Sequence, residues 1–244
     1  MQRVTILSPH RDDAAFSLYL WLKKWINSGV NVRVLNFFTV SAYGPRGTAE
    51  SAEAVSRIRM MEDRRVLCLT GRSIRVRDCD LLDAPLRLRI KPEAVCLPET
   101  YKMAAGSQPE IETLIERHTG LDLVVAPLAT GGHADHLLVL RAAIACSRNH
   151  RLAFYEDLPY AAWKSESELA GCIKEVETAT RVRLMPAVTR RHGAMRQKQN
   201  IIAQYRSQIT PEEAALIAGY SARYGGGERL WIPKRSRGWA LLMN

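Results

Sequence analysis

The sequence lacks the cysteine patterns that indicate a disulfide framework or a metal site built from thiolates. Its five cysteines are odd in number and widely spaced, and no Cys-x-x-Cys pair occurs among them. Disulfide-rich domains and thiolate zinc sites both rely on close, recurrent cysteine spacings. We therefore expect free thiols, most of them in the core of the protein.

Long hydrophobic runs are also missing. No apolar stretch approaches the roughly 18 residues that a membrane-spanning helix needs. The N-terminus does not show the charged, apolar and small-residue order of a secretion signal. We expect a cytoplasmic protein that does not span a membrane.

Two ligand-binding signatures are absent as well. No Gly-x-Gly-x-x-Gly sequence follows a predicted strand, which argues against a dinucleotide site. The arginines are scattered and no zinc-finger or RNA-binding motif occurs, so nucleic acid is not the expected partner. The formal net charge of +10 then has two interpretations, a solvated surface that keeps the protein soluble or attraction to an anionic substrate.

The hydrophobic pattern predicts an α/β protein. Residues 4–8 form a dense apolar run, residues 14–27 are helical in composition, and residues 30–40 indicate a second strand. Strand, helix and strand in this order are typical of a parallel sheet. We therefore predict a Rossmann-like, mostly parallel sheet with helices on both faces.

No internal repeat or low-complexity linker divides the chain, so residues 1–244 are predicted to form a single domain. Its core is expected to span about residues 1–160. The remainder, about residues 161–244, is predicted to be a mixed C-terminal addition. It is mostly helical in pattern and ends in short strand-like segments near Leu230 and Ala240.

Polar side chains follow the first predicted strand directly, in the stretch Pro9-His-Arg-Asp-Asp13. Ligands bind at the carboxyl ends of the strands in an open α/β sheet. His10 and Asp13 are three residues apart at the start of a predicted helix, so both side chains can point at one atom. An Asp pair at a helix start is also a common N-cap, and this alternative stays open.

A second polar stretch, Gly131-Gly-His-Ala-Asp-His136, follows another buried run. The carboxyl ends of parallel strands meet at one edge of a sheet, so the two stretches can form one site. A catalytic zinc site has three nitrogen or oxygen ligands and an open position for water. His10, Asp13 and His136 would complete that set, which leaves Asp12 and His133 uncoordinated as acid–base groups.

These two stretches together resemble the PIG-L/LmbE-like zinc-dependent N-deacetylases. Further segments are similar to parts of the bacterial branch of that family: Arg59-Met-Met-Glu-Asp63, Leu82-Asp-Ala-Pro85, Phe154-Tyr-Glu-Asp-Leu-Pro-Tyr160 and Tyr205-Arg-Ser-Gln208. Many members have Pro before the Asp pair and Glu after it, where this chain has Arg11 and Ala14. That departure leaves the zinc ligands in place and the substrate open.

The resemblance implies a role for each polar residue of the two stretches. His10, Asp13 and His136 would bind zinc, with iron as an alternative occupant of the same ligands. Asp12 would be the general base. Protonated His133 would stabilise the oxyanion, and Asp135 would orient His133 through its other ring nitrogen.

Three further residues are expected to contact substrate: Arg59, Asp83 and Asp157. Each has an alternative role. Arg59 can pair with a neighbouring acid of its own helix, Glu62 or Asp63. Asp83 can cap a turn before a proline, and Asp157 can stand behind a metal ligand or be an ordinary loop acid.

The resulting function is a hydrolase that removes the acetyl group from an N-acetylated amino sugar or an N-acetylglucosamine-containing conjugate. One alternative is a zinc amidase that cuts a different amide, such as that of a thiol conjugate. The other is a non-catalytic relative that binds an anionic ligand. The partner is then a small N-acetylated sugar or glycoconjugate, for which the basic composition raises the expectation of an anionic group.

Overall fold

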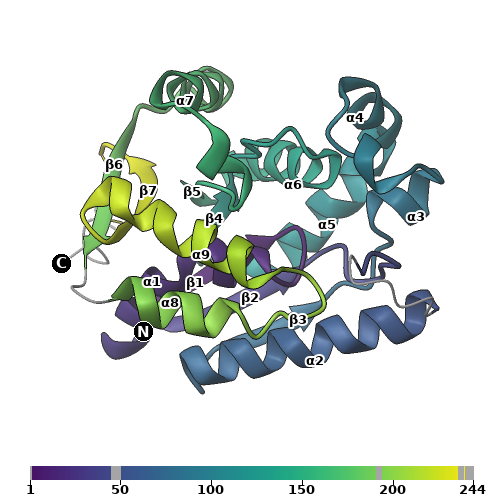
Figure 1. Ribbon diagram of the computed structural model, residues 1–244. Coiled ribbons are helices and arrows are strands. Elements are labelled where there is room, and N and C mark those ends of the chain that lie inside the picture. The colour runs from purple at the N-terminus through teal and green to yellow at the C-terminus, as the bar shows by residue number, and fades with distance from the viewer. Residues whose placement is uncertain (1, 45–50, 191–193, 236–238, 240–244) are drawn as a thin grey trace.

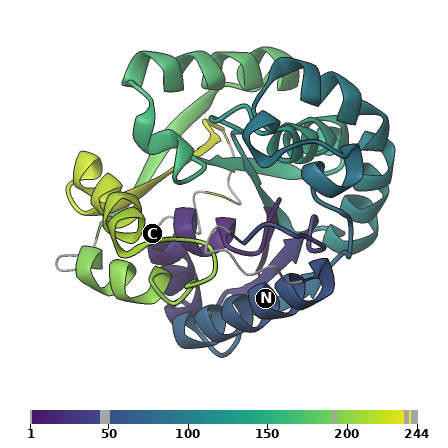
Figure 2. The same ribbon diagram turned by 45° about the vertical axis from the view of Figure 1, so that its right-hand side comes forward.

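The computed structural model describes residues 2–44, 51–190, 194–235 and 239. These residues build one seven-stranded sheet in the order β3-β2-β1-β4-β5-β7-β6 (Figures 1 and 2). Five strands are parallel: β1 (Arg3–Ser8), β2 (Asn31–Asn36), β3 (Arg75–Asp78), β4 (Leu123–Pro127) and β5 (Arg151–Tyr155). The predicted mostly parallel α/β fold is confirmed.

Helices cover both faces of the sheet because the strand residues that point to each face are apolar. On one face, α1 (Asp13–Asn27) and α2 (Ala52–Thr70) pack on the β1 residues Val4 and Ile6 and their neighbours. On the other face lie three helices: α5 (Gln108–Thr119), α6 (Ala134–Ala145) and α7 (Glu166–Thr180). Successive strand residues point to opposite faces, so Leu7 belongs to this second core.

The C-terminal part is not a separate layer placed on the sheet, because it supplies two of the strands. The strand β7 (Gly227–Pro233) runs antiparallel to β5 on one side and to β6 (Leu184–Arg190) on the other. Two helices, α8 (Ala194–Ile202) and α9 (Pro211–Gly219), pack on the α1 and α2 side. Leu230 lies in β7 as expected, whereas the strand expected near Ala240 falls outside the described residues.

Several expected boundaries differ from the observed ones. The second strand ends at Asn36 rather than at residue 40, and β6 lies in a segment whose pattern favoured helix. The segment between Asp83 and residue 108, whose several prolines leave no clear hydrophobic period, contains α3 (Ala84–Leu88) and α4 (Pro98–Ala104). No helix in the described ranges is long and apolar enough to cross a bilayer.

The cysteines are free thiols, but most are not in the core. Only Cys146 is buried, and Cys68 and Cys96 are exposed. The expectation of core thiols was therefore wrong for most positions. Cys68 and Cys172 lie on the helices α2 and α7, and Cys79 and Cys96 lie in connecting segments, where a small thiol is tolerated without full burial.

Candidate active site

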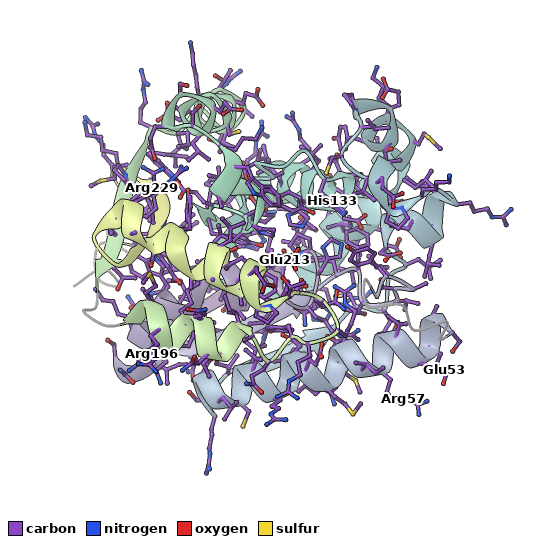
Figure 3. All side chains as sticks on the ribbon, viewed as in Figure 1. Glu53, Arg57, His133, Arg196, Glu213 and Arg229 are labelled. Carbon is purple, nitrogen blue, oxygen red and sulfur yellow. The ribbon has the colours of Figure 1, made fainter. Side chains whose placement is uncertain are left out.

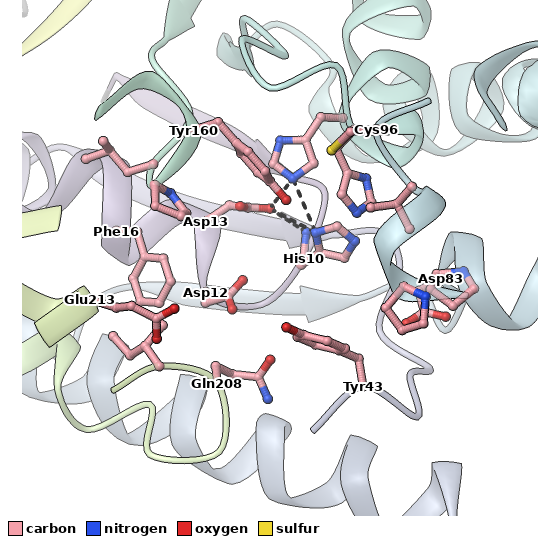
Figure 4. Close-up of a pocket in the computed structure, with 18 of the residues that line it drawn as sticks. His10, Asp12, Asp13, Phe16, Tyr43, Asp83, Cys96, Tyr160, Gln208 and Glu213 are labelled. Carbon is pink, nitrogen blue, oxygen red and sulfur yellow. Dashed lines mark hydrogen bonds and ion pairs between the residues drawn. The ribbon is translucent and has the colours of Figure 1, made fainter. Parts of the chain in front are cut away.

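The two polar stretches meet at the carboxyl end of the sheet, where β1 and β4 are adjacent (Figure 4). His10 lies in the loop after β1, Asp13 is the first residue of α1, and His136 lies in the first turn of α6. Strand β1 pairs with β2 on one side and β4 on the other. The chain therefore leaves β1 and β4 in different directions at a point where α/β sheets typically bind ligands.

Three ligand atoms form a nearly equilateral triangle. The distances are 3.3 Å from His136 Nε2 to His10 Nδ1, 3.4 Å from His136 Nε2 to Asp13 Oδ2 and 3.5 Å from His10 Nδ1 to Asp13 Oδ2. Ligands held about 2.05 Å from a tetrahedral ion lie roughly 3.3 Å apart. Two imidazole nitrogens and one carboxylate oxygen at this spacing fit a divalent metal ion with one face left open.

A second grouping of possible ligands shares His10 and adds His133 and Asp135. It is the weaker candidate because its carboxylate oxygen is already engaged. Asp135 Oδ2 accepts the backbone N–H of Ala84 at 2.9 Å and lies 3.1 Å from His10 Nε2. The triangle of His10, Asp13 and His136 is therefore the better candidate for the metal position.

Buried carboxylates stand behind both histidines of the triangle. Asp157 Oδ1 lies 2.7 Å from His136 Nδ1, and its other oxygen accepts the backbone N–H of Thr130. Asp135 contacts His10 Nε2 and is held by Arg87 at 2.7 Å. Contacts of this kind fix the ring orientation and aim the opposite nitrogen at the metal position.

These contacts correct two expectations. The expected pairing of Asp135 with His133 is wrong, because the Asp135 carboxylate contacts His10 instead. His133 is the N-cap of α6, and its Nδ1 accepts the backbone N–H of Asp135 at 3.1 Å, which turns the carboxylate away. Asp157 is completely buried behind His136 and does not line the cavity, so its position is that of an orienting residue rather than a substrate contact.

The electrostatics of the triangle favour a positive charge at its centre. Burial alone would lower the pKa of His10, but hydrogen bonds and charge from Asp13 and Asp135 outweigh it and raise that pKa to about 10. Burial likewise opposes ionisation of Asp13, yet His136 and His10 lower its pKa to about 2. A proton or a metal ion bound between these three side chains would each supply the positive charge that the arrangement favours.

His133 has the opposite electrostatic setting. Burial first, and then the charges of His10 and His136, hold its pKa well below the usual value. This lowered pKa favours the neutral imidazole, whereas the resemblance implied a protonated His133. Since Nδ1 accepts a hydrogen bond, the proton of the neutral ring sits on Nε2, which leaves His133 a hydrogen-bond donor in the lining of the cavity.

Asp12 occupies the N-cap position of α1, but its side chain makes no capping hydrogen bond. It lines the cavity instead, with Arg59 Nη2 at 3.6 Å from its Oδ2. Arg59 also lines the cavity and does not pair with the acids of its own helix. Glu62 binds Ser207, and Asp63 accepts hydrogen bonds from Asn36 and Tyr205.

Asp83 combines the two roles that were considered for it. Its Oδ1 caps α3 by accepting the backbone N–H of Leu86, and the residue also lines the cavity.

The two positions at which this chain departs from the common family pattern, Arg11 and Ala14, do not reach the cavity. Arg11 is buried and bonds Thr39, Ser56 and Asp78, and Ala14 lies in the core. Neither side chain therefore contacts a molecule in the cavity.

The sequence did not identify Tyr160 as a site residue. Its ring packs edge-on against His136, with ring centres 5.5 Å apart, and lines the cavity. Gly131 makes room for it, because a Cβ at that position would lie 2.3 Å from the Tyr160 ring. The one sequence feature that pointed to Tyr160 was its place at the end of the segment Phe154-Tyr-Glu-Asp-Leu-Pro-Tyr160, which is similar to part of the family. Glu93, Tyr43 and Trp163 also line the cavity but carry no motif.

Comparisons with known proteins agree with this geometry. Residues 5–147 match the family model described as PIG-L, GlcNAc-PI de-N-acetylase. The chain belongs to the PIG-L family. The sequence resemblance is thus confirmed, and the protein is a hydrolase of the deacetylase class.

Individual PIG-L relatives match over nearly the whole chain. The 2'-N-acetylparomamine deacetylase of Streptomyces fradiae is 32% identical over 235 residues, which cover 94% of this chain and 81% of that protein. A crystal structure of a deacetylase from the teicoplanin biosynthesis pathway is 25% identical with a TM-score of 0.67, and the match covers 97% and 99% of the two chains. The N,N'-diacetylchitobiose deacetylase of Pyrococcus horikoshii, at 15% identity, a TM-score of 0.61 and coverage of 95% and 84%, shares the fold.

Proposed function

We propose that this PIG-L protein is a zinc-dependent hydrolase that removes the acetyl group from an N-acetylated amino sugar or a conjugate that contains one. The observation that carries the proposal is the triangle of His10, Asp13 and His136 beside an uncapped Asp12. The relatives named above, which deacetylate amino-sugar compounds by their names, support the substrate class.

Each residue has a distinct task in this reaction. His10, Asp13 and His136 would hold a divalent ion, which would supply Lewis acidity toward an acetamide carbonyl and toward water. Asp12, whose carboxylate lies 3.6 Å from Arg59, accepts a proton from the attacking water. His133 donates its Nε2 proton to the developing oxyanion. Water adds to the carbonyl carbon, the C–N bond breaks, and acetate and a free amine leave after Asp12 or His133 protonates the nitrogen.

The metal assignment is tested by removing one ligand. Purified protein is expected to contain about one zinc ion per chain, and His136→Ala to lose most of it. His118→Ala is the matched control, because His118 lies on α5 and does not line the cavity. Metal content is measured by mass spectrometry of the purified proteins, which also distinguishes zinc from iron. Full metal retention in His136→Ala would contradict the ligand assignment.

The role of Asp12 is tested by Asp12→Asn. The amide keeps the shape of the side chain but cannot accept a proton, so we expect unchanged metal content and a loss of about 100-fold or more in kcat. Acetate release from N-acetylated amino sugars measures the effect. Normal turnover by this variant would show that Asp12 is not the base.

A further inference from the structure

The cavity differs in charge from the rest of the chain. Although the formal net charge is +10, five carboxylates line the cavity among the described residues: Asp12, Asp13, Asp83, Glu93 and Glu213. Arg59 is the one Lys or Arg among those lining residues, and it already pairs with Asp12. In Figure 3, exposed basic residues such as Arg57 and Arg196 lie at the periphery, away from His133 and Glu213 at the centre.

We propose that the outer part of this cavity selects substrates that carry a free ammonium group next to the N-acetylated sugar, and disfavours substrates that carry phosphate or carboxylate. The inference rests on the proposed deacetylase function. It specifies, in addition, the charge of the group that is attached to the sugar in the substrate. It reverses the expectation that the basic composition raised, because the excess of positive charge lies outside the cavity.

The inner and outer ends of the cavity have different chemistry. At the inner end, His133 is only 7% exposed, and its Nε2 has no protein partner within the described chain. That donor and the metal triangle fix the place of the acetamide. The cavity volume of about 420 Å³ leaves room for a second ring attached to the sugar, which would lie toward the rim.

Two carboxylates at the rim are available to a ligand. Glu93 lies in the short 3-10 helix Pro92–Ala94 and makes no hydrogen bond or ion pair with the described part of the chain. Glu213 uses one oxygen to accept the backbone N–H of Thr210 at 2.7 Å, as part of the α9 capping box. Its other oxygen remains for a ligand. Figure 4 shows Glu213 projecting toward the same space as Asp12 and Tyr43.

The position of Tyr43 shows that these carboxylates act on one region although they come from different elements. Burial, and then the charge of Glu213, raises the pKa of Tyr43, and the charges of Asp12 and Glu93 add to this against the effect of Arg59. Carboxylates from three separate elements therefore act together on the Tyr43 hydroxyl. A cation entering beside this hydroxyl is stabilised by the same charges.

Trp163 completes the outer part. It ends the 3-10 helix Tyr160–Trp163, lines the cavity, and is 62% exposed. Its ring packs edge-on against Tyr160, with centres 6.2 Å apart, which holds it at the mouth. An indole face attracts ammonium groups and offers an apolar surface to a sugar ring. Carboxylates combined with an exposed indole favour an amino-bearing ring over an anionic one.

The inference is tested with three substrates of nearly equal shape. Each is an N-acetylglucosaminide of a six-membered cyclitol: a diaminocyclitol, neutral inositol, and inositol phosphate. We expect kcat/KM of the metal-loaded enzyme to fall in that order. We expect the preference for the diaminocyclitol over inositol to weaken as ionic strength rises, because screening weakens charge attraction at an exposed rim.

The rim residues are tested by the ratio of kcat/KM for the diaminocyclitol substrate to kcat/KM for the inositol substrate. A general loss of activity lowers both values equally and leaves this ratio unchanged. Glu93→Gln and Glu213→Gln are each expected to lower this ratio roughly threefold to tenfold. Glutamine preserves the α9 capping box. Trp163→Ala is expected to lower it as well. Glu110→Gln, on the surface of α5, is the matched control and should keep the wild-type ratio.

The possible failures are distinguishable. Acetate release from inositol or its phosphate at rates equal to or above the diaminocyclitol would overturn the charge preference and leave the deacetylase function standing. An unchanged ratio in both glutamate variants would overturn the assignment of the rim. No acetate from any of the three substrates would overturn the proposed function, and the inference with it.

Discussion

At the scale of single residues, proximity in the sequence proved a poor guide to side-chain partners. The family resemblance implied that Asp135 orients His133, which lies two residues before it. In the structure the His133 ring accepts a hydrogen bond from the backbone N–H of Asp135. The Asp135 carboxylate faces His10, which follows a different strand. The sequence grouped His10, Asp13 and His136, which the structure brings together. The contacts of Asp135, in contrast, depend on the N-cap geometry of α6.

Asp157 illustrates the same point and leads to a prediction. Because it holds His136 Nδ1 at 2.7 Å, Asp157→Asn should weaken the ring's orientation and basicity. We expect about a tenfold to hundredfold loss of zinc affinity, measured by competition with a chromophoric chelator. Asp122→Asn is the control, since Asp122 is buried and bonds Thr5 away from the cavity. Equal affinity in both variants would argue against an orienting role.

At the scale of elements, the β-α-β order of the first half followed from its hydrophobic pattern, but the strand β6 did not. Met185 and Pro186 are exposed, and the strand lies at the edge of the sheet, so no buried face repeats along it. Its pairing with β7 involves residues more than 35 positions away, such as Leu184 with Pro233. Such long-range pairing leaves little local signal in the sequence.

A buried ion pair shows how the C-terminal elements are attached to the core. Within α1 the backbone at Leu18 leaves helical geometry, with φ −130° and ψ 18°, and Glu228 of β7 accepts the N–H groups of Leu20 and Trp21. Lys198 of α8 lies 2.9 Å from the same carboxylate, and both side chains are almost completely buried. One acid of β7 thus joins α1 and α8.

Lys198→Met should therefore destabilise the fold strongly. Loss of the ammonium leaves Glu228 buried without its counter-charge, at a cost of about 3–5 kcal/mol. Urea unfolding measures the change in free energy. Lys164→Met is the control, because Lys164 pairs with Glu168 at a solvent-exposed position, where loss of an ion pair costs little stability. Similar losses for both variants would show that the buried pair does not attach these elements.

At the scale of the whole molecule, the location of the site follows from the topology. Adjacent parallel strands β1 and β4 place two loops, more than 100 residues apart in sequence, at one edge of the sheet. The proposed metal ion would therefore connect the first and second parts of the fold. It should stabilise the complete protein, because a ligand that binds only the folded state raises its stability.

The size and pH dependence of this stabilisation form the last prediction. Zinc at about 100 times its Kd contributes roughly 2.7 kcal/mol, which corresponds to a rise in Tm of roughly 5–10 °C for a chain of this length. The pKa of His10 is raised from 6.5 to about 10 in the metal-free folded protein. The stability from this protonation is complete below pH 6.5 and is lost as pH rises toward 10.

Zinc competes with that proton, so zinc binding should tighten with pH over the interval in which the metal-free protein loses stability. The difference in Tm between zinc-loaded and chelator-treated protein is therefore expected to widen from pH 6.5 to pH 8, as followed by circular dichroism. His136→Ala should reduce the difference at both pH values, since it removes a ligand and leaves His10 in place. A difference that narrows with rising pH would show that zinc does not replace a proton held by His10.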